Sequence, residues 1–393
     1  MPSRDPDAPA TRAFVACHRL ASAELPAHRV RALLEAADDA PCAIFELPVS
    51  VWQAAPVGLT EKQVTRLSEI RTAPLDPKLL ERATETGAYA LLHTDPAFPA
   101  NMRDIADTPP LLFVRGELLP DDRYGIAVVG TRRSSPYGNA QAARFAAAFA
   151  AHGLTLVSGG ALGIDAAAHT GALDAGGRTV AVLGCGIDIV YPAVNRALFE
   201  RIMQTGLGAI VSEFPLGTKP EPWRFPTRNR IIAALSRASL LVETPDGSGA
   251  LGTARFCAEY GRDVYVVPGA VDTGRSRGGH RLIGDGAILA DSPEDVLMSL
   301  GVVIAAQEEG EPRKTERVKP SPVMPVVSAP ATPPPDLPPG EAVFLAVLRA
   351  DPQPFDTIAQ IAELSAPEAN VAATMLEMKS LIRRHPGNLF SRA

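Results

Sequence analysis

Residues 125–184, GIAVVGTRRSSPYGNAQAARFAAAFAAHGLTLVSGGALGIDAAAHTGALDAGGRTVAVLG, decide the fold of this 393-residue chain. Within them the apolar runs GIAVVG, LTLVS and RTVAVLG alternate with alanine-rich stretches that are long enough for helices. Continuous apolar strands that alternate with helices indicate a parallel sheet covered on both faces. We therefore predict a doubly wound α/β domain, with helices over 136–151 and 164–174.

The same alternation continues toward the C-terminus. GAIVSE, ASLLVE and DVYVVPG have the character of further buried strands. The patterns around them predict helices over 194–203, 228–235 and 253–260. Together with its lead-in segment, this α/β core is expected to occupy residues 73–300.

The segments that flank the core differ from it in composition. Residues 1–72 read as short helices and predict a small N-terminal helical domain. Residues 301–340 are so rich in proline that they predict an extended, semi-rigid linker. Residues 341–393 hold three short helical patterns followed by PGNLFSRA, which is the outline of a winged helix-turn-helix.

The expected recognition helix of that winged domain is poor in positive charge. It covers 367–379 and carries Glu368 and Glu377, with Lys379 as its one cation. A helix that reads the major groove normally presents several basic or amide side chains. We therefore expect this domain to contribute little to DNA binding.

Composition limits the class of protein. Hydrophobic residues make up 46% of the chain and the net charge is −6, so any DNA-binding cations must be gathered on one face. The four cysteines form no C-x-x-C pair, which argues against a zinc site or a disulfide framework and fits a reducing cytoplasm. The N-terminal stretch has no apolar signal region, and no segment approaches the ~20 apolar residues that span a bilayer. We expect a cytoplasmic protein that makes no membrane contact.

Four connections of the predicted core are rich in glycine, serine, threonine and arginine. In an open parallel sheet, ligands bind at the carboxyl ends of the strands. Glycine lets the backbone approach an anion, a helix start offers free N–H groups, and arginine can bind phosphate through two nitrogens. The four connections together predict a phosphate-binding edge. They are Gly130-Thr131-Arg132-Arg133-Ser134-Ser135-Pro136, Ser158-Gly159-Gly160-Ala161-Leu162-Gly163-Ile164-Asp165, Arg224-Phe225-Pro226-Thr227-Arg228-Asn229-Arg230 and Gly247-Ser248-Gly249-Ala250-Leu251-Gly252-Thr253.

The motifs of common phosphate chemistry are missing from these connections. There is no G-x-x-x-x-G-K-[ST] loop, and the first strand–helix turn is not G-x-G-x-x-G, so nucleotide hydrolysis and NAD binding are unsupported. No metal-ligand spacing occurs. Ser158, His169 and Asp165 could be arranged as a nucleophile, base and orienting group, but nothing in the sequence fixes their geometry. We expect a binding site with no cofactor and no catalytic residues.

Taken in order, five segments of the chain resemble the DprA/Smf family of DNA-processing proteins. They are GTRRSSPYG, VSGGALGIDAAAH, VAVLGCGIDIVYPAVN, VSEFPLGTKPEPWRFPTRNRIIAALS and SGALGTARFCAEYGRDVYVVPG. The resemblance runs without a gap from about residue 123 to residue 297. It implies an extended Rossmann-like core, an N-terminal helical domain similar to a sterile alpha motif, and a C-terminal winged helix.

The resemblance also implies a function. Family members bind single-stranded DNA, form homodimers, and load the recombinase RecA onto DNA during natural transformation and recombination. Matched residue by residue, Arg132 corresponds to the family's phosphate-binding arginine. The DNA- or phosphate-binding residues expected here are Gly130, Thr131, Arg132, Ser158, Gly159, Gly160, Phe225, Arg228, Asn229, Arg230, Ser248, Gly249 and Thr253.

Three positions depart from the family pattern. Leu162 stands where arginine is common, Ala193 where lysine often follows Tyr-Pro, and His280 where asparagine is usual. The loss of two cations is expected to lower the affinity for DNA without changing the function.

Two other functions stay open on the sequence. The chain could hydrolyse nucleoside monophosphates, because the segment from Gly247 to Thr253 resembles the glycine stretch of the lysine-decarboxylase-like group, P-G-G-x-G-T-x-x-E. In this sequence Phe256 stands where that motif has its glutamate, and Glu259 comes three residues later. The chain could also be a regulatory module that binds a free nucleotide.

Overall fold

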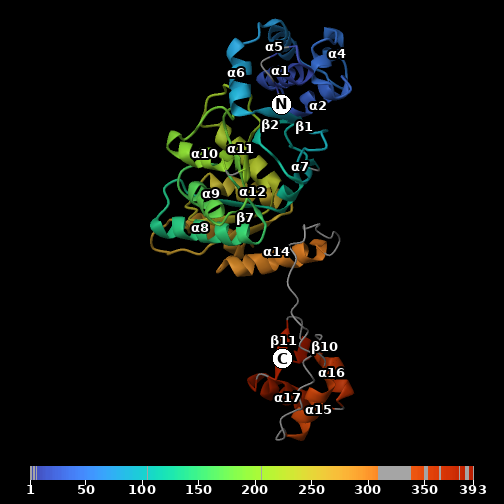
Figure 1. Ribbon diagram of the computed structural model, residues 1–393, viewed down its shortest axis with the longest axis vertical. Coiled ribbons are helices and arrows are strands. Elements are labelled where there is room, and N and C mark those ends of the chain that lie inside the picture. Colours follow the sequence, from blue (N-terminus) through green and yellow to red (C-terminus); the bar gives the residue numbers. More distant parts are fainter. Residues whose placement is uncertain are drawn as a thin grey trace, which may run out of the picture. The chain divides into compact units, whose positions relative to one another are not determined.

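The computed structural model describes residues 2, 5, 7–103, 105–204, 206–308, 338–348, 353–362, 364–379, 381–385 and 389–392. The chain divides into two compact units, Met1–Pro312 and Arg313–Ala393. Figure 1 shows their helices and strands along the sequence, and each unit is described by itself.

The larger unit is built on one mixed sheet with the strand order β1-β2-β6-β5-β4-β3-β7-β8-β9. All pairs from β6 to β9 are parallel, whereas β1 with β2 and β2 with β6 are antiparallel. This confirms the predicted parallel core and adds two antiparallel strands at one edge. The strands are β1 Tyr89–Leu92, β2 Leu111–Gly116, β3 Gly125–Gly130, β4 Thr155–Ser158, β5 Thr179–Val182, β6 Gly208–Ser212, β7 Ser236–Val242, β8 Asp263–Val266 and β9 Ile288–Leu289.

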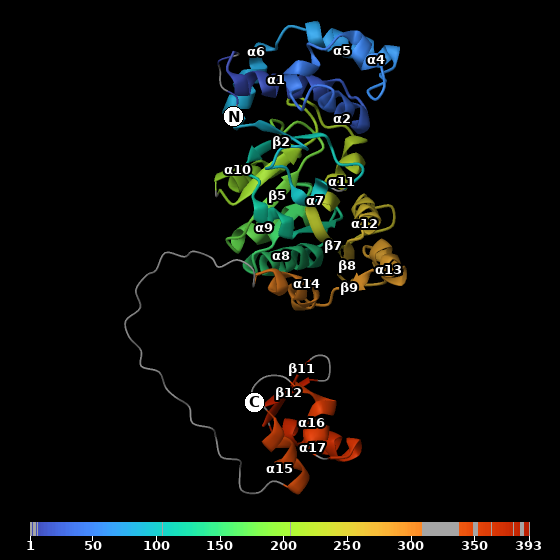
Figure 2. The same cartoon turned by 90° about the vertical axis from the view of Figure 1, so that its right-hand side faces the viewer.

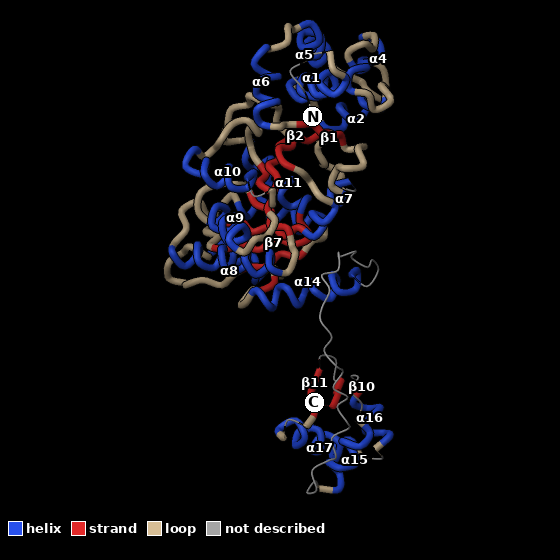
Figure 3. Tube along the Cα trace, viewed as in Figure 1, coloured by secondary structure: helices blue, strands red, loops and turns tan. Residues whose placement is uncertain are grey.

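Helices cover both faces of this sheet (Figure 3). Successive side chains of a strand point to opposite faces, and β3 shows the consequence. Ile126 and Val128 pack in one buried cluster with Phe145, whereas Val129 packs in a second cluster with Ile231. A strand buried on both sides reads as a continuous apolar run, which is why GIAVVG indicated the doubly wound, Rossmann-like fold. The helices are α7 Ala100–Arg103, α8 Pro136–Ala151, α9 Ile164–Asp174, α10 Arg196–Gln204, α11 Arg224–Leu235, α12 Ala250–Glu259, α13 Arg277–Gly284 and α14 Pro293–Glu308, with 3₁₀ turns η1 Pro120–Tyr124 and η2 Ala193–Asn195.

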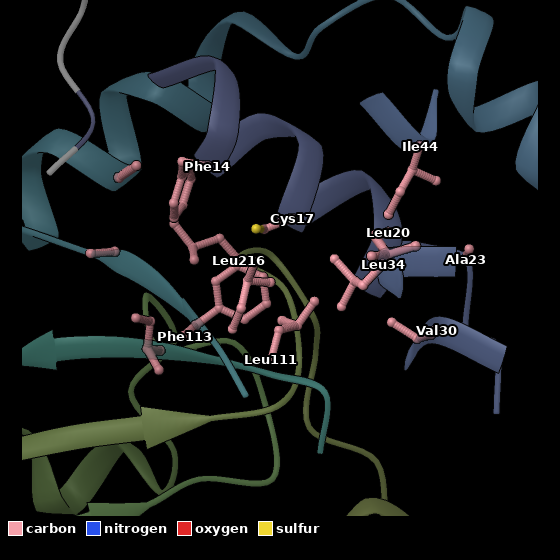
Figure 4. Packing of buried hydrophobic residues seen from close by; sticks show 14 of the residues in the cluster. Phe14, Cys17, Leu20, Ala23, Val30, Leu34, Ile44, Leu111, Phe113 and Leu216 are labelled. Atoms are coloured by element: carbon pink, nitrogen blue, oxygen red, sulfur yellow. The ribbon is translucent and has the colours of Figure 1, made fainter. Parts of the chain in front are cut away.

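An N-terminal group of helices packs against the antiparallel edge of the sheet (Figure 2). Its members are α1 Pro9–Ser22, α2 Ala27–Glu35, α3 Pro41–Ile44, α4 Val49–Gln53, α5 Glu61–Thr72 and α6 Pro77–Thr86. One buried cluster joins these helices to the sheet (Figure 4). The rings of Phe14 in α1 and Phe113 in β2 meet edge to face, with centroids 6.0 Å apart. The predicted boundary at residue 72 and the likeness to a sterile alpha motif stay predictions.

Several predicted boundaries differ from the structure; α12, for example, begins at Ala250 and not at the predicted residue 253. The segment Arg224–Arg230, expected to be a loop, forms the first turns of α11, which begins four residues before the predicted start at 228. Pro226 lies in the first turn of that helix, where a backbone N–H has no helical partner, so proline is tolerated there. Helix α14 runs to Glu308 and occupies the first eight residues of the expected linker, 301–340. The apolar sequence GVVIAA continues the helical pattern there before the prolines begin.

The smaller unit has the predicted winged-helix fold. Its elements are α15 Pro339–Val347, β10 Gln353–Pro354, α16 Phe355–Ile361, α17 Ala366–Met378, β11 Ile382–His385 and β12 Leu389–Arg392. The strands form an antiparallel sheet in the order β10-β12-β11, so IRRH is a strand and not the end of the third helical pattern. The rings of Phe344, Phe355 and Phe390 meet in the core of the unit. Helix α17 matches the expected recognition helix, and directly after its last residue the Lys379 ammonium lies 2.6 Å from a carboxylate oxygen of Glu341.

Candidate nucleic-acid interface

A cleft opens at the carboxyl ends of the parallel strands, where the strand order reverses. The chain proceeds from β3 through β4 and β5 to β6, and then returns to place β7 on the other side of β3. The connections that leave β3 and β7 therefore diverge and leave a crevice between them, as in other doubly wound folds. The cleft has a volume of about 550 Å³. Of the expected site residues, Gly130, Thr131, Arg132, Phe225, Arg228, Asn229, Ser248, Gly249 and Thr253 line it.

A stacked group of side chains forms one wall of the cleft. The guanidinium carbon of Arg132 lies 5.0 Å from the centroid of the Phe225 ring. The ring of Tyr191 lies 5.4 Å from the same Phe225 ring, at an interplanar angle of 33°. Arg132 is exposed, and Tyr191 also reaches solvent. A cation over an aromatic face keeps its N–H groups free for an anion, and an exposed aromatic ring can stack on a base.

The loop that carries Arg132 is fixed by a residue the sequence analysis did not single out. Glu243 follows β7, and its carboxylate accepts hydrogen bonds from the Ser135 N–H at 2.7 Å and the Ser135 hydroxyl at 2.5 Å. The backbone carbonyl of Glu243 accepts a hydrogen bond from the Thr131 N–H at 3.1 Å. Ser135 is the N-cap of α8, as predicted. No motif in the sequence links Glu243 to this loop, because 108 residues separate it from Ser135.

The glycine loop after β7 leaves its backbone open to solvent. Gly247 and Gly249 are exposed, and a side chain added at Gly249 would meet no atom within 4 Å. The Asn229 amide donates to the Gly249 carbonyl at 3.0 Å and ties the loop to α11. The Ser248 hydroxyl accepts from the Ala250 N–H at the start of α12. This loop can therefore bring an anion close to a helix start.

The Ser158–Gly160 segment has a different environment from the one expected. All three residues are buried, and none of them lines the cleft. The Ser158 hydroxyl donates to the Val128 carbonyl at 2.6 Å, and the Asn195 amide donates to the Gly160 carbonyl at 3.0 Å. The structure therefore shows these residues supporting the loop from inside, and a direct DNA contact from them stays a prediction.

Arg228 is a buried cation that holds two strand ends together. Its side chain donates to the Gly159 carbonyl at 2.7 Å and to the Val182 carbonyl. Burial lowers the pKa of Arg228 to about 10, although the nearby Asp165 carboxylate acts in the opposite direction. Burial also raises the pKa of Asp165, with Arg228 opposing the shift. A Cβ on Gly159 would lie 2.5 Å from an Arg228 nitrogen and 2.7 Å from an Asp165 oxygen, so a side chain there would require both of these buried groups to move.

The remaining arginine of the predicted set, Arg230, is also engaged within the protein. It forms an ion pair with Glu213, and both side chains are largely buried. Burial raises the pKa of Glu213, and the charge of Arg230 opposes that rise. Of the three expected arginines, Arg132 is therefore the one whose charge faces solvent.

A short arginine-rich stretch supplies further positive charge beside the cleft. The Arg275 side chain donates to the Arg133 carbonyl at 3.0 Å. In α13, Arg277 and Arg281 lie 3.6 Å and 3.1 Å from Asp246, and both are well exposed. They offset the charge of Asp246, which lines the cleft. The run GRSRGGHR at 274–281 is the sequence signal from which this patch could have been predicted.

The contacts around Ser158, His169 and Asp165 do not assemble a catalytic triad. His169 Nδ1 lies 2.6 Å from the Thr179 hydroxyl, and the Ser158 hydroxyl is directed to the Val128 carbonyl. Burial lowers the pKa of His169 to about 3, so the ring is neutral at pH 7. Among the described residues no group of three or more His, Cys, Asp or Glu side chains could hold a metal ion. None of the described helices combines the length and apolar character that a bilayer crossing requires.

Comparison with known proteins places these features in a family. The family described as DNA recombination-mediator protein A matches residues 89–301, and the DprA winged helix domain matches residues 328–388. Protein Smf of Synechocystis is 34% identical over 372 residues, which cover 88% of this chain and 92% of the relative. DNA processing protein DprA of Streptococcus pneumoniae is 41% identical over 203 residues, or 52% of this chain and 71% of that protein. The X-ray structure of DprA from Streptococcus pneumoniae superposes with a TM-score of 0.61 at 33% identity, covering 71% of this chain and 95% of the other.

Proposed function

Because this chain belongs to the DprA/Smf family of DNA-processing proteins, we propose that it binds single-stranded DNA in the cleft at the strand ends. One observation carries the proposal. The exposed Arg132 guanidinium is held over the Phe225 ring in a cleft that is also lined by the glycine loop Gly247–Gly249. This arrangement offers a charged partner for a phosphate and a backbone surface that a DNA strand can approach closely.

The side chains of the cleft favour a single strand over a duplex. Proteins that bind single strands without regard to sequence combine a positive groove with aromatic rings on which bases stack. Arg132 and Arg133 supply the charge, and Tyr191 supplies an exposed ring beside Phe225. The bases of a duplex are paired and stacked on one another, so they could not reach Tyr191 without unpairing. The overall charge of −6 means that attraction must come from this local patch.

Competition between ligands tests the proposal. A labelled single-stranded oligonucleotide is bound to the full-length protein and challenged with unlabelled single strand, unlabelled duplex or adenosine monophosphate. We expect the single strand to displace the probe, the duplex to do so only at much higher concentration, and the mononucleotide to have no effect. Displacement by the mononucleotide at low concentration would favour the nucleotide-sensing module.

We also propose that the protein acts by binding and not by catalysis. The glutamate that a nucleotide-hydrolysing relative would need is replaced by Phe256, whose ring stacks on Tyr260. Glu259 is exposed and pairs with Arg255 at 3.3 Å, on the surface of α12. A general base must lie within hydrogen-bond reach of its substrate, and Glu259 is not among the residues that line the cleft.

Family membership supports three further proposals. The protein would load RecA onto the bound strand during natural transformation or recombination, it would work in the cytoplasm, and it would form a homodimer.

The structure itself also supports a homodimer. Strand β9 ends the sheet, and its two residues, Ile288 and Leu289, are 42% and 49% exposed. Exposed apolar side chains at the end of the sheet can be buried against a second copy, so Ile288→Lys should shift sedimentation toward the monomer.

A further inference from the structure

Glu243 has a backbone conformation that its residue type rarely adopts. Its φ of +43° lies in the left-handed region, which residues other than glycine rarely adopt. It is also 4% exposed, although it is an acidic residue. Such strain persists only where the surrounding contacts over-determine it, and it is concentrated at functional sites. The contacts of Glu243 must therefore hold it in this conformation.

Those contacts place a carboxylate at the start of α8. Ser135 donates to it through both its N–H and its hydroxyl group, and a Cβ on Gly138 would lie 2.3 Å from its oxygen. The start of the helix after the first strand is where doubly wound folds bind the phosphate of a nucleotide. In this protein an anion of the chain itself occupies that position.

The same turn has little left to offer a phosphate from solution. The Ser135 N–H is used by Glu243, Pro136 has no N–H, and the Gly138 N–H donates to the Ser135 hydroxyl at 3.2 Å. Three of the four residues at 135–138 therefore present no unoccupied donor. Phosphate recognition in this loop therefore depends mainly on the side chains that project from it, Arg132 and Arg133, and Arg132 is the one that stands over Phe225.

Glu243 also holds both ends of the loop that carries Arg132. Its carbonyl binds Thr131 at one end, and its carboxylate binds Ser135 at the other. Only residues 132–134 lie between these anchors, so the loop has little freedom. We propose that Glu243 is a positioning residue for DNA binding: it acts as an internal anion at the start of α8 and fixes the loop so that Arg132 stands over Phe225. The inference rests on the proposed function of the cleft.

The first experiment measures coupling between Glu243 and Arg132. Affinity for a single-stranded oligonucleotide is determined for Glu243→Ala in the wild-type and in the Arg132→Ala background. In the wild-type background we expect Glu243→Ala to lower the affinity for DNA about fivefold, which corresponds to the net free energy of one hydrogen bond. In the second background the loss should shrink to less than about twofold, because the residue that Glu243 positions is already absent.

Two variants complete this experiment. Ser135→Ala, made in the same two backgrounds, removes the hydroxyl that donates to the Glu243 carboxylate and leaves the Ser135 N–H and the Glu243 backbone in place. It therefore decides the question if Glu243→Ala does not fold. Glu259→Ala removes an exposed carboxylate from α12 and is the matched control, for which we expect unchanged affinity. Equal losses in the two backgrounds for Glu243→Ala and Ser135→Ala would overturn the proposal and leave Glu243 a general stabilising residue.

A second experiment needs no DNA. Trypsin cleaves after arginine, and Arg132 and Arg133 are exposed in the loop that Glu243 anchors. Proteolysis of a segment that opens transiently follows the population of its open form, so cleavage at these two residues should be about fivefold faster in Glu243→Ala. Unchanged cleavage there would contradict the proposal. If Arg132→Ala itself leaves DNA binding intact, the proposed DNA site is wrong, and the trypsin result still decides whether Glu243 fixes the loop.

Discussion

Replacement of Arg132 with alanine should weaken the binding of single-stranded DNA by about tenfold. The guanidinium is exposed, and its contact with Phe225 at 5.0 Å is on the surface of the cleft, so the change removes a cation without opening a buried cavity. A hydrogen bond to a charged group contributes about 1.5–3 kcal/mol, and the exposure of Arg132 places it at the lower end. A loss of about 1.4 kcal/mol corresponds to tenfold in affinity. The slope of log affinity against log salt concentration should also become shallower by about 0.7 for one lost phosphate contact.

Fluorescence anisotropy of a labelled oligonucleotide over a series of salt concentrations measures both quantities. Arg66→Ala is the matched control, because it removes one exposed arginine from α5, among the N-terminal helices, where its partner is Glu24. The melting temperature of each variant shows whether the fold is intact. A folded Arg132→Ala protein with the affinity and salt slope of the wild type would refute the reasoning. A loss of the same size in Arg66→Ala would also refute it, since the effect would then follow from net charge alone.

Three other changes have predicted outcomes. Arg228→Met should lower the free energy of unfolding by about 3–5 kcal/mol, measured by urea denaturation, because it leaves the Gly159 and Val182 carbonyls without their donor and removes the cation near the buried Asp165. Burial holds the pKa of His169 at about 3 against an ordinary 6.5, so only the unfolded chain binds this proton as the pH falls below 6.5. The free energy of unfolding should therefore fall by about 3 kcal/mol between pH 6.5 and 4 on account of this group, and His169→Gln should flatten that part of the pH profile. A fragment that ends at residue 308, after α14, should bind single-stranded DNA within about tenfold of the full chain, as measured by mobility shift.

The sequence predicted the elements whose patterns are local. The helices at 136–151 and 164–174 have the expected bounds, because each begins after a loop rich in glycine or serine and ends before a glycine-containing turn. The six strands from β3 to β8 were also predicted, since burial on both faces requires unbroken apolar runs. Strand β9 was not predicted, because its two residues are exposed and form no apolar run. The strand IRRH was misassigned to a helix, because its pairing with β12 depends on residues beyond the local pattern.

The composition of the site was predicted better than the roles of its residues. The local sequence around an arginine in a loop does not show whether its side chain faces solvent or the interior. The pattern of residues therefore could not distinguish the exposed Arg132 from the buried Arg228 and Arg230. The structure separates them by burial and by partners, which are the Gly159 carbonyl for Arg228 and the Glu213 carboxylate for Arg230. Glu243 could not be found from sequence at all, because its role depends on the adjacency of β3 and β7.

The position of bound DNA on the protein is the measurement that tests the central claim most directly. A single-stranded oligonucleotide that carries 5-bromodeoxyuridine is irradiated in complex with the full-length protein, and the cross-linked peptides are identified by mass spectrometry. Cross-links should fall on the peptides that contain Tyr191 and Phe225, the aromatic side chains of the cleft. Cross-links confined to the winged-helix unit or to the N-terminal helices, with none in the cleft, would contradict the account.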